Sequence, residues 1–310
     1  MKKLITILLA LLLLFSLAAC ASAPQSSDST AGGISEATSA PTLAPTEPTE
    51  IATEAPTEAP TEAPTEEAPF PETVLYEYGA AKITATGCEQ ETSNALHILL
   101  DIENPDGLRL NIPELYINNI QMPQSNVSIS EYSGYISIVL DPLFAFGLET
   151  ENLSVLELRM TAYDANGEEH AGELVKLELP ETEYKEPTDL GTLLFDENGV
   201  TLYAHLKTDD GFWGTCIYFY YINNTDRVTT VGSSGNPTYN GGQSGVEAAG
   251  VTSGKITAGR AAVFVSNLYD DQLKEAGIYP VTDITGVLKV YDFDAGTGWL
   301  GPVTVTIPAD

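Results

Sequence analysis

His97-Ile98-Leu99-Leu100-Asp101-Ile102 shows the pattern on which the fold of this chain depends. Apolar residues recur at every second position, and the same short alternation appears at residues 83–86, 155–162 and 175–179, between Gly, Asn, Asp and Pro. A period of two is typical of antiparallel strands that bury one face of a sheet. No stretch carries a long apolar period of 3.6 residues, so we predict an all-β fold.

An internal repeat extends this prediction to the whole region after Pro71. The matching segments are Val74-Leu75-Tyr76 with Leu193-Leu194-Phe195 at an offset of 119, residues 102–106 with 222–226 at 120, and Tyr163-Asp164 with Tyr291-Asp292 at 128. The second match aligns Asn104 with Asn224. Offsets that grow along the chain indicate a duplication with loop insertions.

Each copy has the length and turn spacing of an immunoglobulin-like sandwich of about seven strands. We therefore predict two tandem immunoglobulin-like antiparallel β-sandwiches, at residues 74–180 and 190–310, with an interdomain linker at residues 181–189. The arrangement resembles the tandem immunoglobulin-like domains of bacterial surface lipoproteins, in which an Asn after the strand run and a Tyr-Asp pair recur, as at Asn104, Asn224 and Tyr163-Asp164. This resemblance implies no activity.

Local signals place a few turns and one helix. Asn166-Gly167 and Asn198-Gly199 predict type I′ hairpin turns, because both central residues of that turn need a positive φ. Residues 269–276 are the best helical candidate, ended by Gly277.

The first twenty residues have the features of a secretory signal. Two lysines precede an apolar run that is too short for a spanning helix, and small residues follow. Leu17-Ala18-Ala19-Cys20 resembles the lipobox of bacterial lipoproteins. That resemblance implies a signal peptide at residues 1–19 and a lipidated Cys20 as the mature terminus, held in the cell membrane with the chain on the extracytoplasmic side. An uncleaved anchor is the alternative.

Residues 20–73 predict a disordered acidic tether. The segment has ten acidic residues, no basic residue and nine prolines, with Thr53-Glu54-Ala55-Pro56 repeated along it. Such a composition cannot bury enough apolar surface to offset its chain entropy. It would span about 40 Å as a flexible coil and about 170 Å when extended.

The charge balance excludes some classes of partner. The chain has 44 Asp+Glu against 13 Lys+Arg, for a net charge of −31. Nucleic-acid binding depends on clustered Lys and Arg, so we predict no nucleic-acid partner.

No residue set predicts catalysis, a cofactor or a metal. His97, His170 and His205 are widely separated, and we interpret them as structural. Asp164-Ala165-Asn166-Gly167-Glu168 partly resembles a calcium loop, but its Gly comes too early and its distal Glu is missing, which favours a solvated hairpin tip. Cys88, predicted in a turn, and Cys216, predicted at a strand start, are expected to be free thiols, with a bond between them as the alternative.

The aromatic run after Phe212 carries the one candidate binding site. Alternation places Tyr218 and Tyr220 on one face of a strand and Phe219 and Tyr221 on the other. One face must therefore pack on a neighbouring domain or form an exposed platform. With Trp213, and with Tyr239 and Trp299 expected nearby, a platform of Trp213, Tyr218 and Tyr220 would stack on sugar rings.

These patterns predict a non-catalytic, membrane-anchored surface lipoprotein. Its partners would be the lipid bilayer, through acylated Cys20, and a cell-wall glycan or envelope protein. The alternatives are a carbohydrate-binding module that uses the aromatic platform, and a wall-acting hydrolase.

Overall fold

The computed structural model describes residues 70–92, 94–130, 134–179, 182–208, 214–244, 246 and 251–310. The predicted signal peptide, Cys20 and all but the last residues of the predicted tether lie outside the described residues, and so does Trp213.

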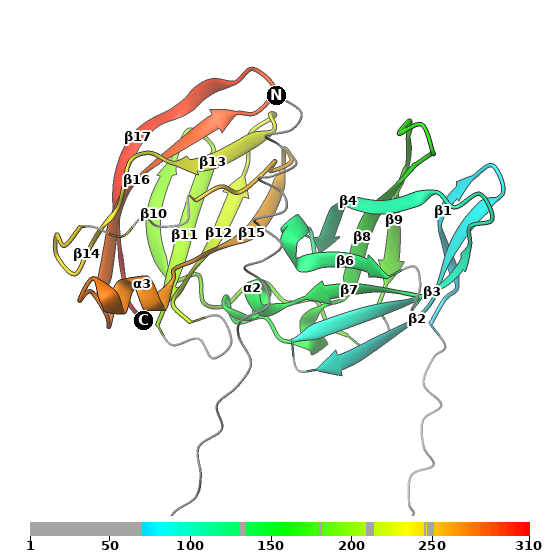
Figure 1. Cartoon of the computed structure of the whole chain (residues 1–310), viewed down its shortest axis with the longest axis horizontal. Helices are drawn as coiled ribbons and strands as arrows, with labels where there is room; N and C mark the ends of the chain where they lie inside the picture. Colours follow the sequence, from blue (N-terminus) through cyan, green and yellow to red (C-terminus); the bar gives the residue numbers. More distant parts are fainter. Residues whose placement is uncertain are drawn as a thin grey trace, which may run out of the picture. The chain divides into compact units, whose positions relative to one another are not determined.

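The first half of the described chain contains nine strands (Figure 1). They are β1 (Thr73–Tyr78), β2 (Ala81–Thr92), β3 (Ala95–Glu103), β4 (Arg109–Ile117), β5 (Ile120–Gln121), β6 (Val127–Ser130), β7 (Tyr135–Val139), β8 (Val155–Tyr163) and β9 (Glu169–Glu178). Three single-turn elements lie between strands: η1 (Gln124–Asn126), α2 (Asp141–Phe144) and η2 (Thr150–Asn152).

The second half contains eight described strands and one short helix. The strands are β10 (Thr192–Glu197), β11 (Val200–Lys207), β12 (Cys216–Asn223), β13 (Thr229–Ser233), β14 (Thr238–Tyr239), β15 (Arg260–Asn267), β16 (Asp283–Asp292) and β17 (Thr297–Pro308). The helix is α3 (Asp270–Glu275). It lies where residues 269–276 predict it, and Gly277 follows with a φ of +70°.

The strands form three sheets, which confirms the all-β prediction. One sheet has the order β1-β2-β3-β7-β6, and a second contains β13, β14, β16 and β17. The third has eight strands in the order β10-β11-β12-β15-β5-β4-β8-β9 and therefore contains strands from both halves. Every described pair is antiparallel except β15 with β5, which is parallel.

The alternating pattern of the sequence becomes the inner face of each sheet. In β8, Leu156, Leu158 and Met160 are fully buried, and the residues between them are partly exposed. They share one core cluster with Ile83 and Ile98 of the facing sheet. Two antiparallel sheets thus pack face to face through every second side chain, as in a sandwich.

Both halves repeat the same strand order, as the duplication predicts. The series β1-β2-β3-β7 corresponds to β10-β11-β12-β15, and β4-β8-β9 corresponds to β13-β16-β17. A bulge interrupts β1 between Val74 and Tyr76, and β10 between Leu193 and Phe195, which are the segments matched at an offset of 119.

The pairing of Asn104 with Asn224 is wrong by one residue. Asn104 Nδ2 donates to the Leu108 carbonyl at 2.8 Å, and Asn223 Nδ2 donates to the Arg227 carbonyl, four residues on, at 2.8 Å. Asn223 therefore does in the second half what Asn104 does in the first. The one-residue shift in the alignment was not evident from the sequence, because Asn223 and Asn224 are adjacent and either one can be aligned with Asn104.

The two Asn-Gly turns differ from each other. Asn198 and Gly199 have φ of +54° and +80° and join β10 to β11 directly, as a type I′ turn requires. At the β8–β9 hairpin only Gly167 has a positive φ, and its N–H donates to the Asp164 carbonyl at 3.0 Å. The I′ prediction is wrong there, because the Asp164 side chain closes a longer loop by accepting the N–H groups of Asn166 and Glu168.

The predicted boundaries at residues 74–180 and 190–310 stay predictions. Described residues of both halves belong to one compact unit, and the eight-stranded sheet continues through the proposed boundary. Residues 182–191 contain no helix or strand.

Candidate functional site

The aromatic strand β12 is buried on both faces. Tyr218 and Tyr220 are 2% and 6% exposed and belong to the core cluster of the first half. Phe219 and Tyr221 point the other way, into the cluster of the second half. The ring of Tyr220 lies 5.4 Å from that of Phe146, which comes from the turn after α2.

Tyr218 and Tyr220 are therefore not part of an exposed platform. The expectation that one face of this strand packs on the neighbouring half is confirmed. Burial raises the pKa of Tyr220 well above its ordinary value, so its phenol stays neutral. A cavity of about 140 Å³ reaches Tyr218, whereas sites for small ligands usually measure about 300–1,000 Å³.

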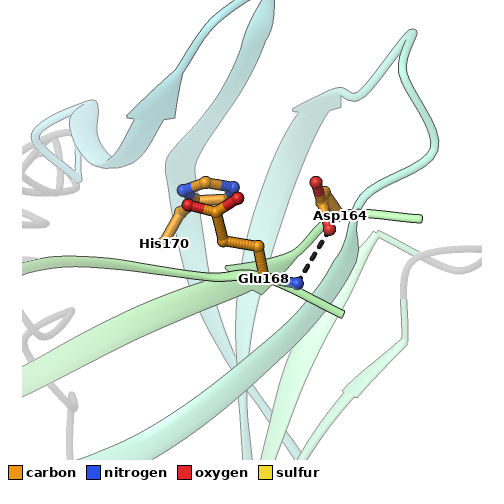
Figure 2. Close-up of side chains that lie close together, drawn as sticks. All are labelled: Asp164, Glu168 and His170. Carbon is orange, nitrogen blue, oxygen red and sulfur yellow. Dashed lines mark hydrogen bonds between the residues drawn. The ribbon is translucent and has the colours of Figure 1, made fainter. Parts of the chain in front are cut away.

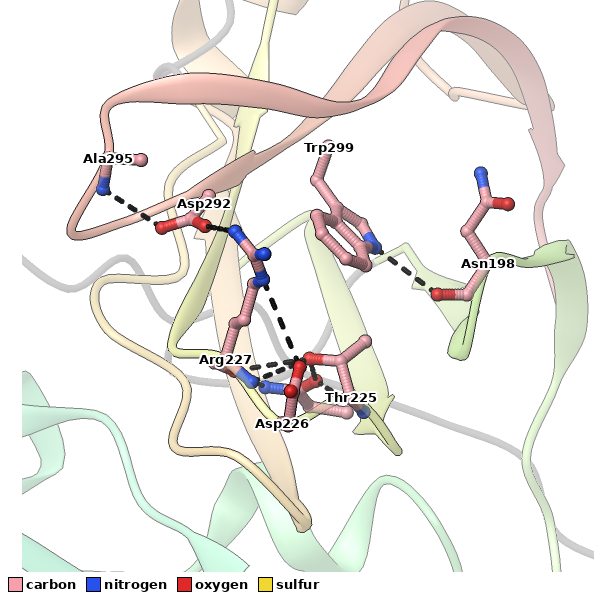
Figure 3. Close-up of polar contacts among 8 residues, drawn as sticks. Asn198, Thr225, Asp226, Arg227, Asp292, Ala295 and Trp299 are labelled. Atoms are coloured by element: carbon pink, nitrogen blue, oxygen red, sulfur yellow. Dashed lines mark hydrogen bonds and ion pairs between the residues drawn. The ribbon is translucent and has the colours of Figure 1, made fainter.

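Tyr239 and Trp299, which were expected near the aromatic platform, are also held in place by the fold. Tyr239 is fully buried. Trp299 donates its indole N–H to the Asn198 carbonyl at 3.2 Å, and the Arg227 guanidinium lies 5.1 Å from its ring centre (Figure 3). Both contacts fix the indole at the edge of the second core.

Arg227 also joins two loops of the second half. Its guanidinium lies 2.6 Å from Asp292 Oδ2, and Asp292 Oδ1 accepts the N–H of Ala295 at 2.9 Å (Figure 3). The N–H of Ala295, followed by Arg227, lowers the pKa of Asp292, and the same ion pair raises the pKa of Arg227. The cluster stabilises the β16–β17 turn.

The joint between the halves is built from backbone and side chains together. Ala261 and Ala262 of β15 pair with Ile120 and Gln121 of β5. The Gln121 side chain extends this pairing: its amide donates to the Lys255 carbonyl at 2.6 Å and accepts the N–H of Thr257 at 3.1 Å.

An arginine secures the same joint. Arg260 Nη1 of the second half lies 2.6 Å from Glu157 Oε2 of the first, and both side chains are about three-quarters buried. The Arg260 guanidinium also lies over the Tyr116 ring, 4.5 Å from its centre, and the Tyr116 hydroxyl contacts Thr257 Oγ1 at 2.9 Å. A charged, hydrogen-bonded pair of this kind fixes one geometry more than it adds stability.

The three histidines occupy different settings. His97 stacks on Tyr135, with ring centres 4.3 Å apart. His205 is buried, and its ring nitrogens lie 2.7 Å from Asp310 Oδ2 and 3.3 Å from Asp189 Oδ1, which ties β11 to the segment between the halves.

His170 also lies beside two carboxylates, and both of them belong to its own hairpin. One potential ligand atom from each of Asp164, Glu168 and His170 lies within 4.8 Å of the others. Figure 2 shows the three side chains on the β8–β9 hairpin, with the Glu168 carboxylate beside the imidazole. No other such group occurs among the residues that the structure describes.

This cluster was not predicted, because the three histidines are widely separated along the chain and were interpreted as structural. The β8–β9 register pairs Ala162 with His170, and the backbone of Asp164 pairs with that of Glu168. Residues two apart on a strand share a face, so the hairpin places all three side chains together. The segment Asp164–His170 carries the signal, because its Asn-Gly hairpin returns Glu168 and His170 to a position beside Asp164.

The two described cysteines are free thiols. Cys88 is half-buried in β2 beside a bulge at Ala85–Gly87, rather than in the predicted turn. Burial, followed by the charge of Glu89, raises its pKa to about 11. Cys216 opens β12, as predicted, and is fully buried.

Comparison with known proteins gives few matches. No family model matches the chain, and no curated protein matches it significantly. One similar solved structure is described as "Structural insight into host cell surface retention of a 1.5-MDa bacterial ice-binding adhesin". It is 10% identical with a TM-score of 0.20, and the match covers 70% of this chain and 57% of that one, so this chain corresponds to little more than half of the other. Within the described part of the chain, no helix is both long and apolar enough to span a bilayer.

Proposed function

We propose that the protein is a non-catalytic bacterial surface lipoprotein that presents a double β-sandwich for interaction at the cell envelope. Cys20 is its lipidation site, and residues 20–73 are the tether between the membrane and the folded part. The observation that carries this proposal is the tetrad Leu17-Ala18-Ala19-Cys20 at the end of a short apolar run. Several acyl chains on one cysteine hold a protein firmly, since each buried CH₂ contributes about 0.8 kcal/mol.

The build of the folded part supports a role in presentation. The parallel β5–β15 pair and the Arg260–Glu157 ion pair join the halves, so the module offers its surfaces in one fixed arrangement. A fixed arrangement reduces the entropy that binding must overcome. The partner in this proposal is an envelope protein or a cell-wall glycan, contacted at a surface other than Tyr218 and Tyr220.

Metabolic labelling with radioactive palmitate tests the anchor. Wild-type protein should incorporate label and sediment with membranes, whereas Cys20→Ala should be unlabelled. Cys88→Ala is the matched control, since it removes a different thiol and leaves the lipobox intact. Equal labelling of wild type and Cys20→Ala would contradict the proposal that Cys20 is the lipidation site.

A further inference from the structure

The β8–β9 hairpin brings three metal-binding side chains to one face. Asp164 directly follows β8, Glu168 precedes β9, and His170 is the second residue of β9. Their potential ligand atoms lie within 4.8 Å of one another, so a small side-chain movement would bring all three within bonding distance of a single ion. The side chains come from seven consecutive residues of one hairpin (Figure 2).

The Asp164 carboxylate is held in place by its own turn. Its Oδ1 accepts the N–H groups of Asn166 and Glu168, both at 2.8 Å, and its Oδ2 accepts the Asn166 side-chain amide at 3.2 Å. A carboxylate held in this way needs little reorganisation to bind a cation.

His170 is held from the opposite side by strand β1. Its ring stacks on that of Tyr78, with centres 3.9 Å apart and an angle of 19° between the planes. The Tyr76 hydroxyl donates to the His170 carbonyl at 3.0 Å. Stacking covers a face of the imidazole and leaves the ring nitrogens at its edge, where metal coordination takes place.

We propose that Asp164, Glu168 and His170 form a binding site for a divalent transition metal of the zinc class. Two carboxylates and one imidazole match the nitrogen and oxygen ligands of zinc, whereas Ca²⁺ needs six to eight oxygens. Three protein ligands leave one position of a tetrahedral ion for water or for a group from a partner. Bound metal would fasten the hairpin tip, and β1 would support it through the stacked ring of His170.

Calorimetric titration of the purified, untagged full-length chain with ZnCl₂ tests the site. Wild type should bind one equivalent. His170→Ala and Glu168→Gln should each weaken binding by about 100-fold, because even partners outside the first coordination sphere contribute 10–100-fold. Glu169→Gln is the matched control: it is exposed on the same hairpin, pairs with Tyr163, and points away from the cluster. It should bind Zn²⁺ as the wild type does.

Two further measurements complete the test. Excess CaCl₂ should leave Zn²⁺ binding unchanged, and displacement would contradict the zinc class. Co²⁺ used as a probe should develop visible absorption bands with wild type and Glu169→Gln, and not with His170→Ala. Circular dichroism of the metal-free variants should match the wild type, since all three side chains are at a hairpin tip. The proposal fails if wild type binds no Zn²⁺, or if His170→Ala and Glu168→Gln bind it as tightly as the wild type.

Discussion

The Cys88 thiol is chemically inert at neutral pH because of where it lies. Burial and the neighbouring Glu89 raise its pKa to about 11, and only the thiolate reacts as a nucleophile. At pH 8 about one Cys88 side chain in a thousand is ionised.

We expect alkylation of Cys88 by iodoacetamide to be slow at pH 8 and to accelerate about tenfold per pH unit up to pH 10. Mass spectrometry of tryptic peptides measures the rate at each residue. A cysteine-containing model peptide is the control, and its rate should level off above its ordinary pKa. Cys216 should stay unlabelled while the protein is folded. A Cys88 rate that levels off near pH 9 would show that the thiol is not shielded.

Asp292 makes stability depend on pH in the acidic range. Its pKa is lowered in the folded protein from an ordinary value of 3.8, chiefly by the N–H of Ala295 and then by Arg227. The ionised form therefore stabilises the fold fully above that ordinary value. The stabilisation is lost as the pH falls below it, through the folded pKa.

Asp292→Asn should therefore lower the free energy of unfolding at pH 7 and flatten its decline below about pH 4. Urea denaturation at a series of pH values measures both effects. Asp294→Asn is the control, because that side chain is exposed in the same turn. If the free energy of unfolding declines equally below about pH 4 in wild type and Asp292→Asn, Asp292 does not cause the pH dependence.

At the scale of strands, β9 can approach β1 closely because it carries a glycine. A Cβ at Gly172 would lie 2.9 Å from Tyr76 Cδ2 and 3.0 Å from the Met160 carbonyl oxygen. The φ of Gly172 is not in the left-handed region, so the glycine provides room rather than an unusual backbone. Tyr76 then reaches across to the backbone of His170.

Gly172→Ala should destabilise the protein by about 1–3 kcal/mol through overpacking. Gly298→Ala in β17 is the matched control, since nothing lies within 4 Å of its Cβ position, and it should be neutral or slightly stabilising. Denaturant unfolding of the two variants gives the comparison. Equal stability of both variants would show that Tyr76 moves aside without cost.

The strands also show how far the sequence could predict this molecule. Local signals predicted local features: alternation predicts β8, and Asn198-Gly199 predicts a hairpin. The repeat predicted that the segments of β1 and β10 correspond, and both of them contain a bulge. The β5–β15 pair could not be predicted, because β5 has only two residues and its partner is about 140 residues away. The Asp164–His170 cluster is local in the sequence, but the placement of its side chains depends on the register of one hairpin. The sequence left two possibilities for Tyr218 and Tyr220, which were packing on the neighbouring domain and an exposed platform. The residues that surround them in the fold show that they are packed.

For the folded part as a whole, the central question is whether its two halves unfold together. They share an eight-stranded sheet, and residues of the second half, including Tyr218 and Tyr220, complete the core cluster of the first. Neither half can unfold alone without exposing that aromatic face and breaking the Arg260–Glu157 pair. We therefore expect a single cooperative transition in differential scanning calorimetry.

Tyr220→Ala should weaken the coupling between the unfolding of the two halves. The substitution removes a buried ring that contacts Phe146, and large-to-small changes of this kind cost about 3–5 kcal/mol. We expect a lower melting temperature and a transition that broadens or divides, as each half begins to unfold independently. Tyr269→Ala, at a side chain that is 57% exposed, should leave the transition within about 0.5 kcal/mol of the wild type. Two resolved transitions in the wild type, unaffected by Tyr220→Ala, would mean that the shared sheet does not couple the halves.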